Sequence, residues 1–577
     1  MKKWYKYIRP YLKYFIIGPL CMIVEVIGEV VMPKLLSIVI NNGNLGKLTI
    51  GSSLGTMTLM IVTALLMMAS GVGGAYFGAK ASVNFAADLR ADAFAKVQKY
   101  AFANIDKFST GSLVTRLTND VTQMQNFVNM MLRMALRAPG MLIGALVMSI
   151  ILKPSLAVIF AVTIPLMLLS VSFIIKTGFS RYALVQKKVD QLNSTVQENV
   201  TNVRVVKSFV REDYEEEKFR NANKDLKQSG INAVKVMIFM QPVLTLFMNI
   251  TTIAVVWFGG NMVIAGGMRI GDLSAFITYV TQILVSLMMI TMLLMFSSRA
   301  LASAKRIREV LDEKIALTDD NAKYPDLKVE KGEIEFKNVS FKYYKNSEEH
   351  VLENINIKIP ARSTIGIIGS TGCGKTTLVS LISRLYDADS GEVLVDGVNV
   401  KDYSLQHLRD GVGVVLQKNA LFSGTIEENL RWGNEKASRE EIVNAASNAQ
   451  ADGFVSSFTD GYETMLDQGG TNVSGGQKQR LCIARALLKK PKVLILDDST
   501  SAVDTTTETQ IRKTFSNELK DSTKIIIAQR ITSVMSADQI IVMNDGKITG
   551  IGTHDQLLSS NTEYQEIYYS QMDKKGA

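Results

Sequence analysis

The sequence predicts a multidomain membrane protein in which a six-helix all-α transmembrane domain precedes a soluble α/β domain. The mean hydropathy of the 577 residues is +0.15, which is high for a soluble protein. The first 300 residues contain six apolar stretches of bilayer length, and after residue 330 a short apolar run leads into a glycine-rich loop. Three cysteines are too few for a disulfide framework, so a small secreted scaffold is excluded.

Six stretches are apolar over the roughly 20 residues that a helix needs to cross a bilayer. They lie approximately at 14–40, 54–79, 128–152, 155–175, 240–264 and 273–296. The first is too long for the core of a cleavable signal peptide and lacks a clear small-residue cleavage site. We therefore expect a transmembrane domain over residues 1–310.

Charge is distributed unevenly along the chain, whose net charge is +10. Residues 1–300 hold 30 basic and 15 acidic residues, and the remainder holds 34 and 39. Of the 30 basic residues, 26 lie in the N-terminal leader, in segments 80–137 and 176–235, and at Arg299. The positive-inside rule then places both termini in the cytoplasm. Because the excess lies in the apolar half, it fits juxtamembrane loops, and a nucleic-acid partner is not expected.

Four ionisable residues lie inside the predicted spans, where charge is costly. Glu25 and Glu29 are one helical turn apart in the first span, and Arg133 and Arg137 in the third. They could form a polar wall of a translocation path, or they could be interfacial or ion-paired structural residues. The sequence leaves both interpretations open.

The cytoplasmic segments between the spans have helical periodicity and few helix breakers, so we expect helices that continue well past the membrane. A charged linker follows at 311–330, in which Tyr324-Pro325 breaks any helix. The soluble domain is therefore expected over residues 331–577.

A short buried strand is expected at Ile365–Ile368, directly before a glycine-rich loop. The loop matches the phosphate-binding pattern G-x-x-x-x-G-K-[ST] between a strand and a helix. In such a loop the glycines let backbone N–H groups point into one concavity, Lys375 reaches the β and γ phosphates, and the Thr376 hydroxyl can ligate magnesium. The candidate nucleotide-binding residues here are Gly369, Ser370, Thr371, Gly372, Cys373, Gly374, Lys375, Thr376 and Thr377.

A second strand, Lys492–Leu496, leads into Asp497 and Asp498. Carboxylates at the carboxyl edge of a parallel sheet lie where a magnesium-bound nucleotide would sit, so Asp497 is the candidate magnesium-side carboxylate. Between the two strands, Ser474-Gly475-Gly476-Gln477 opens a helix that Pro491 stops. A turn of this kind at a helix N-terminus is a second anion-binding device.

These motifs, behind six spans with long cytoplasmic helices, resemble a half-transporter of the ATP-binding cassette (ABC) exporter family, and the resemblance covers essentially the whole chain. It implies an α/β P-loop NTPase domain that binds ATP and Mg²⁺. It also implies that Tyr343 stacks on adenine and that Gln417 contacts the magnesium and senses the membrane domain.

The resemblance further implies that two chains act together. Two ATP molecules are each held between the phosphate loop of one chain and the signature of the other, which here is Ser474, Gly475, Gly476 and Gln477. Ser501–Asp504 would be the loop that crosses to the partner. Short helices near 102–108 and 209–213 would be the coupling elements that dock on the nucleotide domains.

Two positions where the family has residues that act in hydrolysis depart from its pattern. Asp498 stands where the family has the Glu that orients or deprotonates the attacking water, and a carboxylate withdrawn by roughly 1 Å can cost about 10²-fold in rate. Gln529 stands in place of a His that contacts the γ-phosphate, and Gln cannot become a cation near pH 7. We therefore expect the candidate catalytic residues Asp498, Gln529 and Gln417 to form a site that binds ATP but hydrolyses it slowly.

This expectation leads to the hypothesis of a heterodimer. A second, homologous chain would bring the Glu and the His, while the signature of this chain, changed only at the preceding Val473, completes the partner's site. A slow homodimer in which Asp498 still works is the alternative.

The expected activity is ATP-driven export of amphipathic or hydrophobic compounds, such as drugs, lipids or peptides, across the plasma membrane of a bacterium. This expectation rests on the resemblance and on methionine-rich spans, whose flexible side chains suit varied apolar ligands. An importer of metal chelates with the exporter fold, or a nucleotide-gated regulator that transports little, are the other interpretations.

Overall fold

A computed structural model of the chain describes residues 2–45, 50–344, 348–498 and 505–572. The chain divides into two compact units. The first consists of Met1–Val97 and Gly111–Asp312, and the second of Gln98–Thr110 and Glu313–Ala577. A short segment of the N-terminal half therefore belongs to the C-terminal unit.

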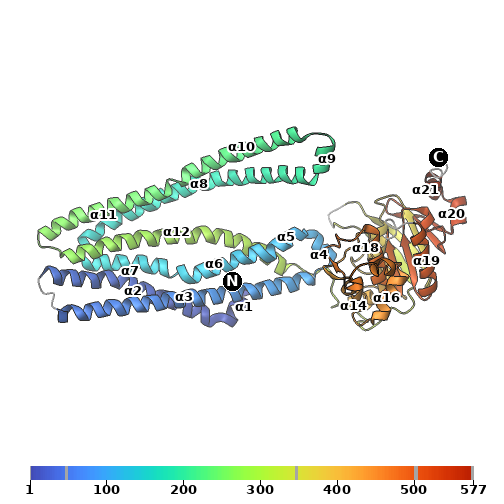
Figure 1. Cartoon of the computed structure of the whole chain (residues 1–577), viewed down its shortest axis with the longest axis horizontal. Helices are drawn as coiled ribbons and strands as arrows, with labels where there is room; N and C mark the ends of the chain where they lie inside the picture. The colour runs from blue at the N-terminus through green and yellow to red at the C-terminus, as the bar shows by residue number, and fades with distance from the viewer. Residues whose placement is uncertain (1, 46–49, 345–347, 499–504, 573–577) are drawn as a thin grey trace. The chain divides into compact units, whose positions relative to one another are not determined.

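The first unit is helical (Figure 1). Among the described residues, six helical segments, some of them made of consecutive shorter helices, are long and apolar enough to cross a membrane, which confirms the predicted number of spans. They run over Lys3–Asn44, Leu54–Gln98, Thr110–Leu152, Pro154–Thr201, Glu212–Ile264 and Ile270–Asp312. With 48 residues, the fourth is about 72 Å long, more than twice the roughly 30 Å of a bilayer's hydrocarbon core. Such a helix extends far beyond the membrane.

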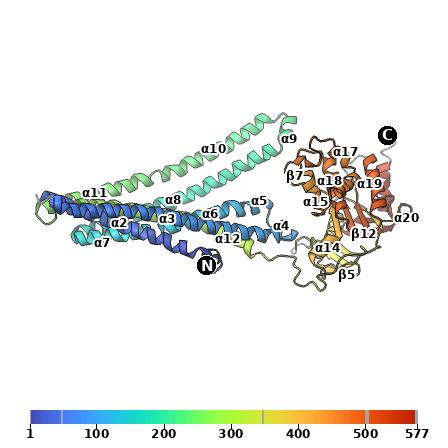
Figure 2. The ribbon, with the colours of Figure 1, turned by 60° about the horizontal axis from the view of Figure 1, so that its bottom comes forward.

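In detail, the helices of this unit are α1 (Lys2–Ile8), α2 (Leu12–Asn44), α3 (Ile50–Gln98), α5 (Thr110–Thr115), α6 (Val121–Met134), α7 (Arg137–Leu152), α8 (Pro154–Thr201), α9 (Val203–Ser208), α10 (Glu212–Met237), α11 (Met240–Ile264) and α12 (Ile270–Asp312). A π-helical turn, Arg116–Asp120, joins α5 to α6, and a 3₁₀ turn, Arg9–Tyr11, joins α1 to α2. Helices α8 and α10 run side by side and are joined at their ends by α9 (Figures 1 and 2).

Two prolines interrupt the helices near the predicted spans. The span predicted at 128–152 is not one continuous helix, because α6 ends at Met134 and α7 begins at Arg137. Pro139 offers no N–H to the carbonyl of Ala135, and its ring crowds that carbonyl. Pro242 stands in the same relation to Ile238, where α10 gives way to α11.

The short helix predicted near 209–213 lies earlier in the chain. It is α9, Val203–Ser208, and the next helix begins only at Glu212. Val210 adopts a left-handed conformation with φ of 50°, and the N–H of Arg211 bonds back to the carbonyl of Val206 at 3.0 Å. This hydrogen bond closes the C-terminal end of the helix, so Phe209 to Arg211 form the turn.

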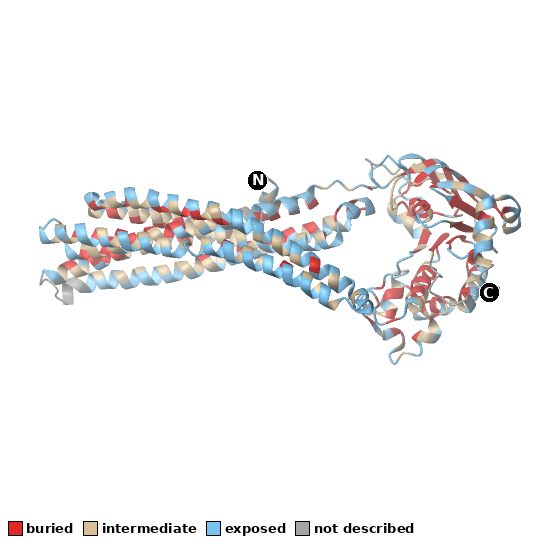
Figure 3. Cartoon of the chain, turned by 90° about the horizontal axis from the view of Figure 1, so that it is seen from above, coloured by how far each residue is buried: buried red, intermediate tan, exposed pale blue. Residues whose placement is uncertain are grey.

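Many residues of the long helices are exposed (Figure 3), and large apolar residues are among them. Val72, Ile151 and Leu169, for example, are each about two-thirds exposed. Exposure of many large apolar side chains is costly in water. Its placement on six helices of spanning length fits contact with lipid.

The second unit contains two main sheets. The antiparallel sheet has the order β2-β1-β4-β5, formed by β1 (Ile334–Phe341), β2 (Leu352–Ile359), β4 (Ser390–Val395) and β5 (Val398–Asn399). The larger sheet has the order β12-β11-β3-β10-β9-β6, formed by β3 (Thr364–Gly369), β6 (Val412–Val415), β9 (Val493–Asp497), β10 (Thr523–Ile527), β11 (Gln539–Asn544) and β12 (Lys547–Gly552). All its pairings are parallel except that of the edge strand β12. The short strands β7 (Gly424–Thr425) and β8 (Met465–Leu466) pair separately.

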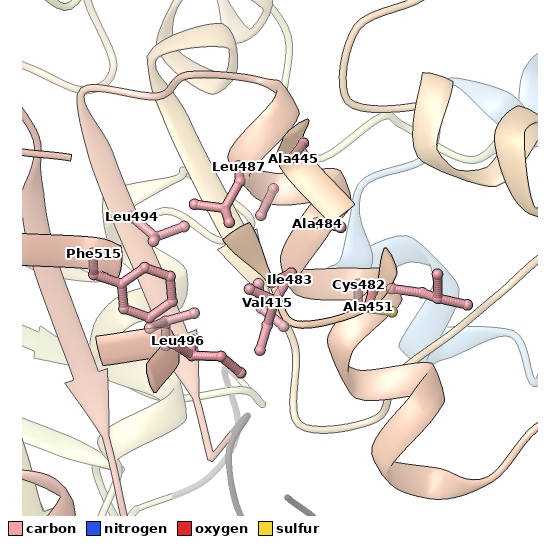
Figure 4. Close-up of a cluster of buried hydrophobic side chains, with 14 of the residues drawn as sticks. Val415, Ala445, Ala451, Cys482, Ile483, Ala484, Leu487, Leu494, Leu496 and Phe515 are labelled. Carbon is pink, nitrogen blue, oxygen red and sulfur yellow. The ribbon is translucent and has the colours of Figure 1, made fainter. Parts of the chain in front are cut away.

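Helices surround these sheets: α13 (Lys375–Ile382), α14 (Leu405–Gly411), α15 (Ile426–Arg431), α16 (Arg439–Asn448), α17 (Asp452–Val455), α18 (Gly475–Leu488), α19 (Thr505–Glu518), α20 (His554–Ser560) and α21 (Thr562–Met572). Figure 4 shows part of the core between them. Ile483 and Leu487 of α18 are buried in the same cluster as Leu494 and Leu496 of β9. This core fixes both the turn that opens α18 and the carboxylates at the end of β9.

Helix α4 (Phe102–Lys107) lies in the second unit although it precedes most of the first in sequence. The hydroxyl of Tyr386 donates a hydrogen bond to Asp106 Oδ2 at 2.7 Å, and the ring of Phe102 lies 6.1 Å from that of Tyr386. Asn104 donates to the carbonyl of Lys314 at 2.8 Å and accepts from the N–H of Ala316 at 2.9 Å. These bonds tie α4 to the linker.

Candidate functional site

The phosphate loop connects β3 to α13, as its sequence predicts. Gly372 and Gly374 adopt φ values of +89° and +96°, a backbone conformation that side chains disfavour. Lys375 Nζ donates to the carbonyls of Gly369 at 2.9 Å and Ser370 at 2.7 Å, so its ammonium lies over the loop. Cys373 is buried beneath the loop. The loop thus has the concave backbone and the cation that an oligophosphate requires.

Thr376 and Asp497 meet at the base of this loop. The Thr376 hydroxyl donates to Asp497 Oδ1 at 3.1 Å, although 121 residues separate them. Burial raises the pKa of Asp497, an effect that the Thr376 hydrogen bond opposes and the charge of Asp498 reinforces. Magnesium binds through oxygen ligands, with one or two protein carboxylates or hydroxyls plus phosphates. A hydroxyl and a buried carboxylate in contact therefore fit magnesium at this position.

Asp498 follows β9 in a left-handed conformation, with φ of 47°. Its Oδ2 accepts hydrogen bonds from Gln529 Nε2 at 2.7 Å and from Gln417 Nε2 at 3.5 Å. Burial raises the pKa of Asp498, and the two glutamine hydrogen bonds oppose that rise. The three residues predicted to be catalytic therefore meet at one carboxylate oxygen, and both side-chain amides donate to it.

Tyr343 lies at the other side of the loop and is 41% exposed. Its hydroxyl lies 2.9 Å from the hydroxyl of Thr377, one of the predicted nucleotide-binding residues. Its ring meets Phe341 edge to face at 5.0 Å and Tyr386 at 5.2 Å. The ring is thus held by two aromatic neighbours while part of it stays exposed, which is compatible with stacking on a base.

The Ser-Gly-Gly-Gln turn caps α18. Ser474 Oγ accepts from the N–H of Gln477 at 3.3 Å, and Gln477 Oε1 accepts from the N–H of Ser474 at 2.9 Å. Ser474 and Gly475 are exposed, and within the described ranges no hydrogen bond joins this turn to the phosphate loop. The structure therefore does not bring the signature and the phosphate loop of one chain together. The predicted crossing loop, Ser501–Asp504, lies outside the described residues.

Several residues around the site were not identified from the sequence. Tyr386 supports Tyr343, and the hydroxyl of Ser370 donates to Asn544 Oδ1 at 3.3 Å. Gln571, close to the C-terminus, bonds the backbone of residues 529 and 531. Tyr386, Asn544 and Gln571 belong to no motif, and only the fold places them here.

The charges in the predicted spans also form contacts. Arg137 Nη2 lies 2.5 Å from Glu29 Oε1 and 3.2 Å from Glu25 Oε1, and all three side chains are largely buried. The ion-paired interpretation therefore applies to these residues. Arg133 lies beyond the helix break, and among the described residues it forms no ion pair with either glutamate.

A phosphate loop that faces a strand-end carboxylate defines a P-loop nucleotide-binding domain, which here follows six membrane helices. Comparison with known proteins gives the same assignment. Residues 15–287 match the ABC transporter transmembrane region, and residues 352–501 match the ABC transporter domain.

Along its whole length of 577 residues, the chain is 39% identical to the "Uncharacterized ABC transporter ATP-binding protein YfiB" of Bacillus subtilis, all of which is covered. It is 34% identical over 479 residues to the "Fatty acid ABC transporter ATP-binding/permease protein" of Mycobacterium bovis, with 83% of this chain and 75% of that one covered. The chain belongs to the ABC transporter family and is a half-transporter, with one transmembrane and one ATP-binding domain.

A solved structure of a bacterial Atm1-family ABC exporter with ATP bound shares the fold. The TM-score is 0.78 at 24% identity, over 97% of this chain and 98% of that one. The predicted fold class is therefore confirmed.

Proposed function

We propose that this chain is one half of a heterodimeric, ATP-driven exporter whose own phosphate loop retains ATP while a partner chain performs most of the hydrolysis. The observation that carries the proposal is the pairing of Asp498 with Gln529 at 2.7 Å. In this pairing a short carboxylate accepts from a neutral amide.

ATP would be held by the residues of the phosphate loop. Lys375 would leave the two carbonyls that it now contacts and bind the β and γ phosphates, and the loop's N–H groups would bind the same oxygens. Tyr343 would stack on the adenine. Thr376, Asp497 and Gln417 would hold the magnesium ion, which would neutralise part of the negative charge on the phosphates.

Slow hydrolysis follows from the groups around Asp498. A base for the attacking water needs a carboxylate oxygen directed at that water, and Asp is one methylene shorter than Glu. The oxygen that is hydrogen-bonded to Gln529 is also shared with Gln417. Gln529 cannot supply positive charge to the γ-phosphate that the water attacks.

The exposure of the signature supports the proposal that this chain completes the nucleotide site of its partner. The Ser474 turn is preformed by its two capping bonds and is exposed, so it can bind the γ-phosphate of an ATP held on another chain. Amphipathic or apolar cargo is supported by the name of the fatty acid transporter to which this chain is related. We place the complex in a bacterial plasma membrane with both termini cytoplasmic.

The test compares the chain alone with the chain purified together with a homologue that has Glu and His at the two altered positions. We expect magnesium-dependent ATP hydrolysis to require the pair and to disappear when the homologue's Glu is replaced by Gln. Equal activity of this chain alone would overturn the proposal. A nucleotide-gated regulator, which the same Asp498 and Gln529 would favour, predicts no stimulation of hydrolysis by any transported compound.

A further inference from the structure

Helix α21 (Thr562–Met572) contacts the candidate nucleotide site although none of its residues belongs to a recognised motif. Its residue Gln571 accepts a hydrogen bond from the N–H of Ile531 at 2.8 Å through Oε1. The same side chain donates from Nε2 to the carbonyl of Gln529 at 2.9 Å. One carboxamide therefore holds the backbone on both sides of residue 530.

These two hydrogen bonds hold the backbone of Gln529, whose side chain donates to Asp498. Gln529 can donate to Asp498 at 2.7 Å only while its backbone holds its present position. The segment that follows it, Ile531–Ser533, is a single 3₁₀ turn, which has little rigidity of its own. Gln571 therefore supplies restraint that the local sequence does not.

The same helix also reaches the phosphate loop. Glu563 Oε1 accepts from Asn544 Nδ2 at 3.0 Å, and Asn544 Oδ1 accepts from the Ser370 hydroxyl at 3.3 Å. The Thr549 hydroxyl also donates to Glu563, which fixes the carboxylate. Eight residues separate Glu563 from Gln571, or about 12 Å along an α-helix. One rigid element is thus connected to both loops.

Helix α21 is itself anchored in the core. Tyr564 is fully buried, and its hydroxyl lies 2.7 Å from His554 Nδ1. Tyr564 belongs to the same buried cluster as Ala528 and Ile531. The helix is therefore firmly packed and can hold the two loops at a fixed separation.

We propose that α21 is a positioning element of the nucleotide site, in which Gln571 orients Gln529 toward Asp498 and Glu563 stabilises the phosphate loop through Asn544. Neither residue is catalytic, since each acts through another. The inference rests on the proposed function only in that Asp498 and Gln529 face the bound ATP.

The two residues predict separate effects. In the full-length chain, Gln571→Ala should slow single-turnover, magnesium-dependent ATP hydrolysis about tenfold, since a hydrogen-bonded orientation is lost, and leave the Kd for ATP unchanged. Glu563→Ala should raise the Kd for ATP about tenfold and leave hydrolysis at saturation nearly unchanged. Glu563→Gln, which keeps an acceptor for Asn544, should restore the Kd.

Gln565→Ala is the matched control. Gln565 lies on the same helix and donates to the carbonyl of Leu558 at 2.8 Å, away from both loops. A purely structural role for α21 would make Gln571→Ala and Gln565→Ala alike in rate and in Kd, which would overturn the inference. A uniform loss of rate and affinity that tracks a lower Tm would also overturn it.

A milder variant and a second measurement guard against misfolding. Gln571→Glu keeps the acceptor for Ile531 and loses the donor to Gln529. Amide hydrogen exchange at Ile531 should therefore stay slow in Gln571→Glu and rise at least about tenfold in Gln571→Ala. Equal exchange in both variants and the unsubstituted chain would overturn the proposal. Brisk hydrolysis by the unsubstituted chain would instead contradict the proposed slow site, and the effect of Gln571→Ala could still be measured.

Discussion

Gln529 donates a hydrogen bond to Asp498 Oδ2 at 2.7 Å, so the carboxylate at the end of β9 is bound by a neutral amide. Gln417 donates to the same oxygen at 3.5 Å. A carboxylate held in this way is well ordered, but it lacks both the reach of a Glu and a neighbouring imidazole that could become a cation.

Lengthening that side chain should therefore restore activity. We expect Asp498→Glu to raise the magnesium-dependent ATPase rate of the isolated chain, and Asp498→Glu combined with Gln529→His to raise it about 10²-fold, the cost attributed to a misplacement of roughly 1 Å. Phosphate release would be measured at saturating ATP. Asp498→Asn is the control and should give no increase. If the double variant is no faster than the unsubstituted chain, these two positions do not limit hydrolysis.

The phosphate loop allows a comparison between two glycines with similar φ values. A Cβ at Gly374 would lie 2.8 Å from Leu352 Cδ2 and 2.9 Å from the carbonyl oxygen of Val351, whereas nothing lies within 4 Å of a Cβ at Gly372. Both alanine substitutions cost about 1–2 kcal/mol in backbone strain, and Gly374→Ala should lose a further 1–3 kcal/mol or so through overpacking.

Thermal unfolding without nucleotide would separate the two effects. The Tm of Gly374→Ala should lie below that of Gly372→Ala, which should in turn lie below that of the unsubstituted chain. Equal Tm values for the two variants would mean that β2 and the loop that precedes it move aside at little cost.

The ion pairs of Arg137 should matter to the stability of the first unit. Removal of one partner leaves the others buried and unpaired, so Arg137→Met should lower the free energy of unfolding by about 3–5 kcal/mol. The triple variant Glu25→Gln, Glu29→Gln, Arg137→Met removes every charge of the cluster and should recover most of that loss. Unfolding in detergent would be followed for each. If the triple variant is as unstable as Arg137→Met alone, packing rather than charge explains the effect.

The elements with strong local signals could be predicted from the sequence. The six spans follow from length and hydropathy, and the strand–loop–helix unit follows from glycines and Lys375 at fixed spacing. The position of Asp497 and Asp498 could be predicted because a buried strand of a parallel sheet places such residues at the carboxyl ends of the strands. In the structure the Thr376 hydroxyl contacts Asp497 there.

Contacts between distant segments could not be predicted in this way. The helix breaks after Met134 and Met237 depend on Pro139 and Pro242. Hydropathy does not reveal them, because both prolines lie in or beside long apolar stretches. Helix α9 ends before the predicted range 209–213 because Val210 adopts a left-handed conformation. The sequence does not signal this turn, because a valine and not a glycine occupies the position. Gln571 lies 42 residues from Gln529 and in no motif, so only the folded chain brings the two together.

Tyr386 connects α4 to Tyr343 of the candidate site and provides the last prediction. Its hydroxyl donates to Asp106 Oδ2 of α4 at 2.7 Å, and its ring meets that of Tyr343 at 5.2 Å. Burial, and to a smaller extent the hydrogen bond to Asp106, raises the pKa of Tyr386. The hydroxyl therefore stays protonated and donates throughout the neutral pH range.

Tyr386→Phe keeps the ring and removes only this bond. Since a hydrogen bond to a charged group contributes about 1.5–3 kcal/mol, amide exchange in Phe102–Lys107 should become at least about tenfold faster while the Kd for ATP stays unchanged. Tyr344→Phe is the matched control, because Tyr344 is an adjacent tyrosine that is 72% exposed. If exchange in α4 is the same in Tyr386→Phe and Tyr344→Phe, then Asn104 and Phe102 hold this helix without help from the hydroxyl.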